Sequence, residues 1–209
     1  MKKAALHNLG CKVNAYETEA MQHLLEEAGY EIVPFTQKAD VYVINTCSVT
    51  NMADRKSRQM LHKAKKNNPD SIVVAAGCYV QTSEKEVLND LSVDIVIGND
   101  RKHDLVRLLE EYSLDSVNDT VYDINDGKHD FEELFIDQTK EHTRAFIKVQ
   151  DGCNQFCSYC IIPYARGRVR SRRFENVIAE VERLAANGFK EVVLTGIHLS
   201  SYGVDFEEA

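Results

Sequence analysis

The chain has 209 residues, of which 44% are hydrophobic and 28% are charged, and its formal net charge is −8. This length allows one large domain or two small ones, and the absence of any run of about 18 apolar residues excludes a membrane-spanning helix. The N-terminal MKKAALHNLG is too weakly apolar for a signal peptide, so we expect a cytoplasmic protein whose six cysteines are thiols or metal ligands rather than disulfides.

Most of the negative charge lies in one segment. Residues 110–141 contain eleven acidic residues and two lysines and carry a charge of −9, whereas the rest of the chain carries +1. The rest of the chain can therefore bind an anionic partner despite the acidic net charge.

Strand and helix patterns alternate through the first part of the chain. Strand patterns fall at residues 3–9, 30–33, 40–46, 71–77 and 93–98, with helical patterns between and after them. This alternation predicts an α/β domain over residues 1–112, with a Rossmann-like, mostly parallel sheet and helices on both faces. Asn14 followed by Glu17 is typical of a helix N-cap with its reciprocal glutamate, and Asn99 or Asp100 is expected to cap the last helix.

The acidic segment interrupts this alternation. We predict that residues 113–141 form a linker or a loosely packed hairpin, with short strands at 120–124 and 133–137.

A second unit, residues 142–209, has a strand at 143–152, a helix from Phe174 to Ala185 and a strand at 190–198. Two parallel strands cannot bury their faces alone, so either the chain is a piece of a longer protein, which we favour, or this unit docks on the first domain.

Three widely spaced cysteines occupy equivalent positions in the predicted sheet. Cys11, Cys47 and Cys78 each follow a strand, at the carboxyl edge where α/β proteins bind ligands. Helix N-termini at that edge would lower thiol pKa values and favour an anionic cluster, and Gly10 and Gly77 would allow close backbone approach. We favour a metal site, with buried cysteines acting as small hydrophobic residues as the alternative.

Three closely spaced cysteines form a more specific pattern. Cys153, Cys157 and Cys160 have the spacing C-x₃-C-x₂-C, and soft thiolates of this kind suit an iron–sulfur cluster. A zinc site would need a fourth Cys or His nearby, and none lies within the loop. The alternatives are a loop of free thiols or a disulfide-stapled binding protein. A four-iron cluster with three cysteines leaves one iron open to a small chelating molecule.

The triplet, with the aromatic Tyr159 before its last cysteine, resembles the signature of the radical S-adenosylmethionine (SAM) superfamily. The resemblance implies that the open iron binds SAM, which the cluster cleaves to a 5′-deoxyadenosyl radical. It maps a backbone contact with adenine onto Tyr159. Further SAM contacts map onto Thr195, Gly196 and His198, of which His198 can equally be an ordinary polar loop residue.

Motifs along the whole chain resemble the methylthiotransferases within this superfamily. They are NLGCKVNAYETE, VINTCSVTNMADRKSRQ, AAGCYVQ, DGCNQFCSYCIIPYARGRVRSR and TGIHLSSYG. The resemblance implies an auxiliary [4Fe-4S] cluster whose open iron carries a sulfur that one SAM methylates, and a second [4Fe-4S] cluster whose SAM supplies the radical. The ligands would be Cys11, Cys47 and Cys78 for the first cluster, and Cys153, Cys157 and Cys160 for the second. No catalytic side chain is assigned.

Two motifs, GCKVN and PYARGRVRSR, are most similar to the branch that modifies N6-threonylcarbamoyladenosine, with Lys12 and Val13 as the discriminating residues. This implies a cytoplasmic enzyme that adds a methylthio group to C2 of the tRNA adenosine 3′ of the anticodon. Its partners would be the tRNA anticodon stem-loop and a reductant such as flavodoxin or ferredoxin. The alternatives are the branches acting on isopentenyladenosine in tRNA or on a ribosomal-protein aspartate, and a non-catalytic iron–sulfur protein.

Arginines follow the cysteine loop in the run ARGRVRSRR. Such a run is usually a solvated face, but contact with tRNA phosphate or with the anionic cluster is an equal alternative here, so Arg166, Arg168 and Arg170 are predicted to bind substrate.

By the resemblance to the methylthiotransferases, residues 142–209 form only the start of a radical-SAM partial (β/α) barrel. The rest of that barrel and the C-terminal RNA-binding barrel of the family are absent, so this piece alone is expected to be inactive.

Overall fold

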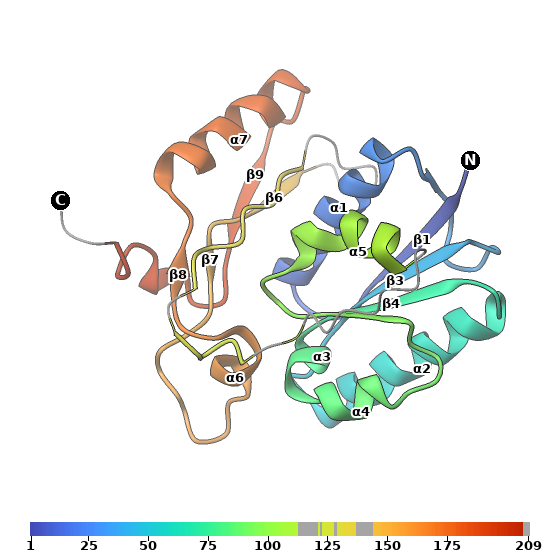
Figure 1. The fold of residues 1–209 in the computed structure, drawn as a ribbon. Coiled ribbons are helices and arrows are strands. Elements are labelled where there is room, and N and C mark those ends of the chain that lie inside the picture. The colour runs from blue at the N-terminus through green and yellow to red at the C-terminus, as the bar shows by residue number, and fades with distance from the viewer. Residues whose placement is uncertain (113–120, 122, 128, 137–143, 207–209) are drawn as a thin grey trace.

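Five parallel strands form one sheet in the order β2-β1-β3-β4-β5 (Figure 1). The computed structural model describes residues 1–112, 121, 123–127, 129–136 and 144–206. The strands are β1 (Lys3–Asn8), β2 (Glu31–Ile32), β3 (Val41–Thr46), β4 (Ile72–Gly77) and β5 (Ile95–Ile97). Because β3 lies between β1 and β4, its sequence VYVINT is buried along its whole length. The predicted parallel α/β domain is confirmed.

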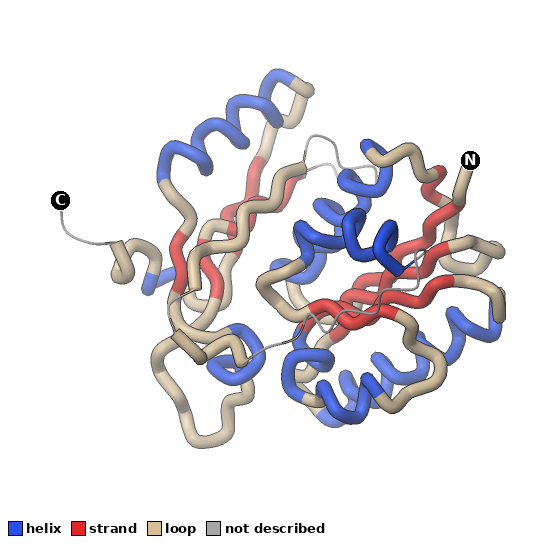
Figure 2. Tube along the Cα trace, viewed as in Figure 1, coloured by secondary structure: helices blue, strands red, loops and turns tan. Residues whose placement is uncertain are grey.

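Helices cover both faces of this sheet (Figure 2). They are α1 (Lys12–Glu27), α2 (Asn51–Asn67), α3 (Cys78–Thr82), α4 (Glu84–Leu88) and α5 (Leu105–Tyr112), with the single turn η1 (Lys102–Asp104) before α5. On one face α1 contributes Met21 and Leu25 to the core together with the leucines of α5. On the other face α2 contributes Leu61, and α3 contributes Tyr79. None of the described helices is long and apolar enough to cross a membrane.

Both predicted helix caps are wrong. Helix α1 begins at Lys12 with Cys11 as its N-cap, and Asn14 and Glu17 are buried within its first turns. The turn before α5 has Arg101 as its N-cap, while Asn99 is fully buried. The side chains of Asn14, Glu17 and Asn99 bind residues far away in the sequence, which a local capping pattern cannot reveal.

The second region contains the predicted strand–helix–strand unit. Strands β6 (Ala145–Lys148) and β9 (Val192–Thr195) pair in parallel, and α7 (Phe174–Ala186) lies between them in sequence. The cysteine loop follows β7 (Gln150–Asp151), which pairs antiparallel with β8 (Arg170–Ser171). Short elements complete this region, namely α6 (Ile162–Arg166) between the loop and β8, and η2 (Leu199–Ser201) after β9.

This second unit docks on α1 of the first. Tyr16 and Ala20 of α1 share a hydrophobic cluster with Ile147 of β6 and Leu184 of α7. For a unit with only two parallel strands, the sequence favours a piece of a longer protein over docking, and the structure shows the docking. It buries one face of a sheet that could not be stable alone.

Part of the predicted acidic linker belongs to the same hydrophobic cluster. Leu134 and Ile136 are buried in it, 3% and 0% exposed. The described parts of 120–124 and 133–137 contain no strand, in contrast to the prediction, while residues 120, 122 and 137 lie outside the described residues. The domain boundaries near 112 and 142 stay predictions, since residues 113–120 and 137–143 lie outside as well.

Candidate functional site

The three widely spaced cysteines lie at the carboxyl edge of the five-stranded sheet. Cys11 is the N-cap of α1, Cys47 follows β3, and Cys78 is the first residue of α3 directly after β4. The register of β3 and β4 pairs Thr46 with Gly77, so Cys47 and Cys78 follow paired positions.

Glycine makes the close approach of these segments possible. Gly10 has a φ of 116°, and a Cβ there would lie 3.0 Å from the Cβ and 3.1 Å from the Sγ of Cys47. Gly77 has a φ of 97°, and a Cβ there would lie 2.5 Å from Asn45 Oδ1. Both positions have a left-handed backbone, and a Cβ would be tight at Gly10 and would overlap its neighbours at Gly77, so glycine is favoured at both.

No group of three or more His, Cys, Asp or Glu side chains among the described residues meets at a single metal-ion position. All six cysteines are free thiols. This arrangement does not fit one zinc ion, which needs its ligands around a common centre. Three thiolates are the donor type of a four-iron cluster, in which each thiolate binds a different iron. Metal binding by either triplet stays a prediction.

The second triplet lies on the loop between β7 and α6. Gly152 precedes it with a φ of 69°, and a Cβ there would lie 1.9 Å from the carbonyl oxygen of Arg168. The N–H of Cys153 donates to Gly167 O at 3.1 Å, and that of Cys160 donates to Cys157 O at 2.9 Å. The first bond attaches the start of the loop to Gly167, the second closes a turn within the loop, and Cys157 is exposed.

The predicted SAM contacts come from two segments, the cysteine loop after β7 and the end of β9 with the loop that follows it. Tyr159 is 91% exposed between Cys157 and Cys160. Thr195 ends β9 and is 6% exposed, and a Cβ at Gly196 would lie 2.9 Å from Gln150 Oε1. Gln150 was not identified from the sequence.

Gln150 connects the loop after β9 to the start of the cysteine loop. Its Oε1 accepts from the N–H of His198 at 2.7 Å, and its Nε2 donates to Asp151 O at 2.6 Å and to Gly152 O at 2.8 Å. The His198 ring contacts the hydroxyl of Ser201 through Nδ1 at 2.6 Å.

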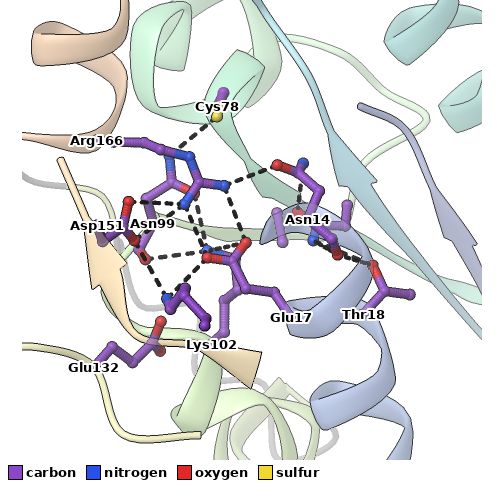
Figure 3. A network of polar contacts seen from close by, with 12 residues as sticks. Asn14, Glu17, Thr18, Cys78, Asn99, Lys102, Glu132, Asp151 and Arg166 are labelled. Carbon is purple, nitrogen blue, oxygen red and sulfur yellow. Dashed lines mark hydrogen bonds and ion pairs between the residues drawn. The ribbon is translucent and has the colours of Figure 1, made fainter. Parts of the chain in front are cut away.

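A buried polar network joins the two cysteine regions (Figure 3). Arg166 of α6 is completely buried, and its Nη1 contacts Glu17 Oε1 at 2.9 Å and Asp151 Oδ2 at 3.0 Å. Its Nη2 donates to Asn14 Oδ1 at 2.8 Å, an atom that also accepts from the Cys11 thiol at 3.4 Å. Helix α6 starts two residues after Cys160, so Arg166 connects the second triplet to the first.

Asn99 makes a second connection of this kind. Its Nδ2 donates to Ala165 O of α6 at 2.6 Å and lies 3.5 Å from Cys78 Sγ. Burial raises the pKa of the Cys78 thiol, and the nearby Arg166 guanidinium opposes that rise. The sequence contained a signal for Asn99 only as a possible helix cap, and its true partners are up to 66 residues away.

Charge inside the network keeps its carboxylates ionised. Burial alone would raise the pKa of Asp151, but Arg166 and Lys148 hold it far below its usual range. The pKa of Glu17 is likewise lowered, because the attraction of Arg166, Lys102 and Lys148 outweighs its burial. Both groups are therefore carboxylates at neutral pH.

The arginine run divides into buried and exposed members. Arg170 is 5% exposed and donates to Arg166 O, and Arg172 is fully buried and paired with Glu180 and Glu133. Arg168 and Arg173 are exposed, and the Arg168 guanidinium lies 4.2 Å from the centre of the Phe156 ring. Of the three arginines predicted to bind substrate, only Arg168 has a solvent-facing side chain.

Two family models match the chain, one for each region. Residues 3–98 match the model described as uncharacterized protein family UPF0004, and residues 147–208 match the radical SAM superfamily. The chain therefore combines a UPF0004 region with a radical SAM region.

The chain is also similar in sequence to tRNA methylthiotransferases and related tRNA-modifying enzymes from several bacteria. The chain is 47% identical to threonylcarbamoyladenosine tRNA methylthiotransferase MtaB of Bacillus subtilis (strain 168), over all of this chain and 46% of that protein. It is 45% identical to the protein of that name from Aquifex aeolicus (strain VF5), over 97% of this chain and 50% of that protein. A tRNA-2-methylthio-N(6)-dimethylallyladenosine synthase of Bacillus mycoides (strain KBAB4) is 35% identical over 99% of this chain and 42% of that protein.

The chain thus spans about half the length of the curated relatives it matches. Its fold resembles the radical SAM methyltransferase TsrM from Kitasatospora setae with a TM-score of 0.64, over 96% of this chain and 48% of that one. The sequence identity is 15%, so this likeness supports the fold alone.

Proposed function

We propose that this chain contains both cluster-binding regions of a cytoplasmic tRNA methylthiotransferase that acts on C2 of N6-threonylcarbamoyladenosine beside the anticodon. One observation carries the proposal. Two cysteine triplets, one at the sheet edge and one after β7, are connected through α6 in a chain that is 47% identical to a threonylcarbamoyladenosine tRNA methylthiotransferase.

The cysteines have distinct proposed roles. Cys11, Cys47 and Cys78 would hold the auxiliary [4Fe-4S] cluster, and Cys153, Cys157 and Cys160 the cluster that binds SAM. When bound, these groups would supply the electron, the radical and the sulfur, and the protein would position them. The backbone of Tyr159 and the Thr195–His198 loop would contact SAM, with Gln150 fixing that loop next to Gly152.

Exposed groups would serve the macromolecular partners. Arg168, held against Phe156, and Arg173 are available to tRNA phosphates of the anticodon stem-loop. A reductant such as flavodoxin or ferredoxin would deliver electrons to the SAM-binding cluster.

Iron and sulfide content tests the two cluster sites. After anaerobic reconstitution, the chain should contain about eight irons and eight sulfides, as two cubane clusters require. Cys11→Ala should contain about four of each. About four irons in both proteins would remove the auxiliary site, and a colourless protein without iron would contradict the whole proposal.

Nucleoside analysis tests the substrate. Because the chain alone is expected to be inactive, the longer protein that contains it is expressed in a bacterial strain that lacks its own tRNA methylthiotransferases, and tRNA nucleosides are measured by liquid chromatography and mass spectrometry. The proposal expects the 2-methylthio derivative of N6-threonylcarbamoyladenosine. The derivative of isopentenyladenosine would instead favour the branch represented by the 35% identical relative.

The remaining alternatives need a second assay. The longer protein is purified, reconstituted and incubated with SAM, a reductant and either tRNA or a ribosomal protein, and both 5′-deoxyadenosine and methylthiolated product are quantified. Product on the ribosomal protein would support that branch, and clusters without any SAM cleavage would support a non-catalytic iron–sulfur protein.

A further inference from the structure

The buried network beside Cys78 contains several ion pairs among the described residues (Figure 3). Two carboxylates, Glu17 and Asp151, contact four cations in it. The cations are Lys102, Lys148, Arg166 and Arg170. All six side chains belong to residues that are at most 5% exposed.

A third carboxylate reduces this excess without removing it. Glu132 is 8% exposed and acts electrostatically on Lys148, while its Oε1 accepts from the His103 backbone N–H. Three carboxylates and four cations leave one positive charge. Buried charges in native proteins are normally balanced, because an uncompensated one is costly to desolvate. This excess among the seven side chains favours an anion next to them.

The positive charge lies next to the auxiliary cysteines. Arg166 shares Asn14 Oδ1 with the Cys11 thiol and interacts electrostatically with Cys78. Asn99 links Cys78 Sγ to the backbone of Ala165, the residue before Arg166. An anion held by these cysteines would thus lie near the guanidinium of Arg166, which is itself fully buried.

A ligated four-iron cluster has the required sign. Three thiolates outweigh the positive charge of the oxidised iron–sulfide core, so the cluster with its ligands is an anion, and reduction makes it more negative. We propose that Arg166 is the buried counter-ion of the group held by Cys11, Cys47 and Cys78, and the positioning residue that holds α6 against it. This inference rests on the proposed function, because it requires a cluster at these cysteines.

A counter-ion changes a measurable property of the cluster. A nearby positive charge stabilises the reduced form more than the oxidised form, so it raises the midpoint potential. Removing Arg166 should lower that potential. The Glu17 carboxylate pairs with Arg166 and offsets its charge, so removing the negative charge of Glu17 should raise the midpoint potential.

The experiment isolates the auxiliary cluster. Cys153, Cys157 and Cys160 are changed to alanine in the full chain, the protein is reconstituted with iron and sulfide, and the midpoint potential is measured by redox titration followed by electron paramagnetic resonance. Arg166→Gln and Glu17→Gln are compared in this background. We expect shifts in opposite directions, although both substitutions break the same ion pair and should destabilise the fold alike.

Two further variants separate charge from packing. Arg166→Lys keeps the charge and loses the planar fork, so its potential should stay close to that of the parent. Arg172→Gln is the matched control, since Arg172 is equally buried in the same segment but pairs with Glu180 and Glu133. It should lower thermal stability and leave the potential unchanged.

The outcomes distinguish this inference from the proposed function. Shifts of the same sign in Arg166→Gln and Glu17→Gln, or no shift in either, would overturn the counter-ion role while leaving the cluster in place. If Arg166→Gln assembles no cluster, Glu17→Gln decides, and an unchanged potential there overturns the inference. Absence of iron from the parent protein would overturn the proposed function itself.

Discussion

Single residues with unusual backbone geometry shape the candidate site. Gly10, Gly77 and Gly152 each precede a cysteine, and each has a positive φ and a close neighbour where a Cβ would be. The contact at Gly152 is the closest of the three, at 1.9 Å from Arg168 O. These glycines are therefore required by the loops that present the thiols and cannot be replaced without moving them.

Gly152→Ala is expected to lower the free energy of unfolding of the metal-free chain by more than about 2 kcal/mol. The left-handed backbone alone costs an alanine about 1–2 kcal/mol, and the overlap with Arg168 O adds to it. Urea unfolding followed by circular dichroism measures the change. The control is Gly188→Ala, where φ is 94° but no atom lies within 4 Å, so only the backbone cost remains. Equal losses in the two variants would contradict this explanation.

His103 makes stability depend on pH. Its hydrogen bond to Glu132 raises its pKa above 6.5, although partial burial opposes the rise. The pKa of His103 is therefore higher in the folded chain than in the unfolded chain, where it is about 6.5. Protonated His103 stabilises the fold fully below about pH 6.5, and this stabilisation is lost as the pH rises through the pKa of the folded state. Between pH 6 and 8 the wild type should therefore lose more stability than His103→Gln. Thermal unfolding across that range measures the difference, and parallel curves would count against it.

At the scale of elements, α1 connects the two regions. Met21 and Leu25 pack on the sheet, whereas Tyr16 and Glu17 face the second region. The Tyr16 hydroxyl donates to Leu134 O and also contacts Glu180 of α7. The helix thus has two buried sides, which explains why polar residues that resemble a capping box are completely enclosed.

Tyr16→Phe should loosen the second region selectively. It removes a buried hydrogen bond worth about 1 kcal/mol between α1 and the segment around Leu134. Hydrogen exchange of the amides in 133–136 and in β6 should become faster. Tyr42→Phe is the control, because its hydroxyl bonds Gln37 O and Ala39 N within the first region. Faster exchange in β6 in Tyr42→Phe, or an unchanged exchange rate in Tyr16→Phe, would show that the Tyr16 hydroxyl does not hold the second region on α1.

At the scale of the whole molecule, the two regions share a core. Ile147 of β6 is fully buried in the cluster that also contains Tyr16, Leu134 and Leu184. A unit that depends on its neighbour for a buried face should unfold with it.

The metal-free chain is therefore expected to unfold in one cooperative transition. Ile147→Ala should move that transition as a whole and cost about 2–5 kcal/mol, as large-to-small substitutions in cores do. Differential scanning calorimetry measures both properties. Two separate transitions, with only one of them shifted by Ile147→Ala, would show that the regions fold independently.

Much of the architecture could be predicted from local patterns. The strand VYVINT, the alternation up to residue 112 and the helix from Phe174 follow from hydrophobic periodicity, which depends on near neighbours in the sequence. The acidic segment could not be predicted in this way. Its many carboxylates suggested a linker, but Leu134 and Ile136 are core residues and Glu133 pairs with Arg172.

The sequence by itself determined the class of fold, the two cysteine triplets and their placement after strands, because strand order and residue spacing dictate which loops reach one edge of a parallel sheet. Only the tertiary structure decided the roles of Asn14, Glu17 and Arg166. Their partners lie up to 152 residues away, and the charge balance of a buried network depends on contacts between distant segments. For this reason Asn14 and Glu17, which resemble a helix cap, and Arg166, which belongs to a run expected to be solvated, form the contacts that connect the two cysteine regions.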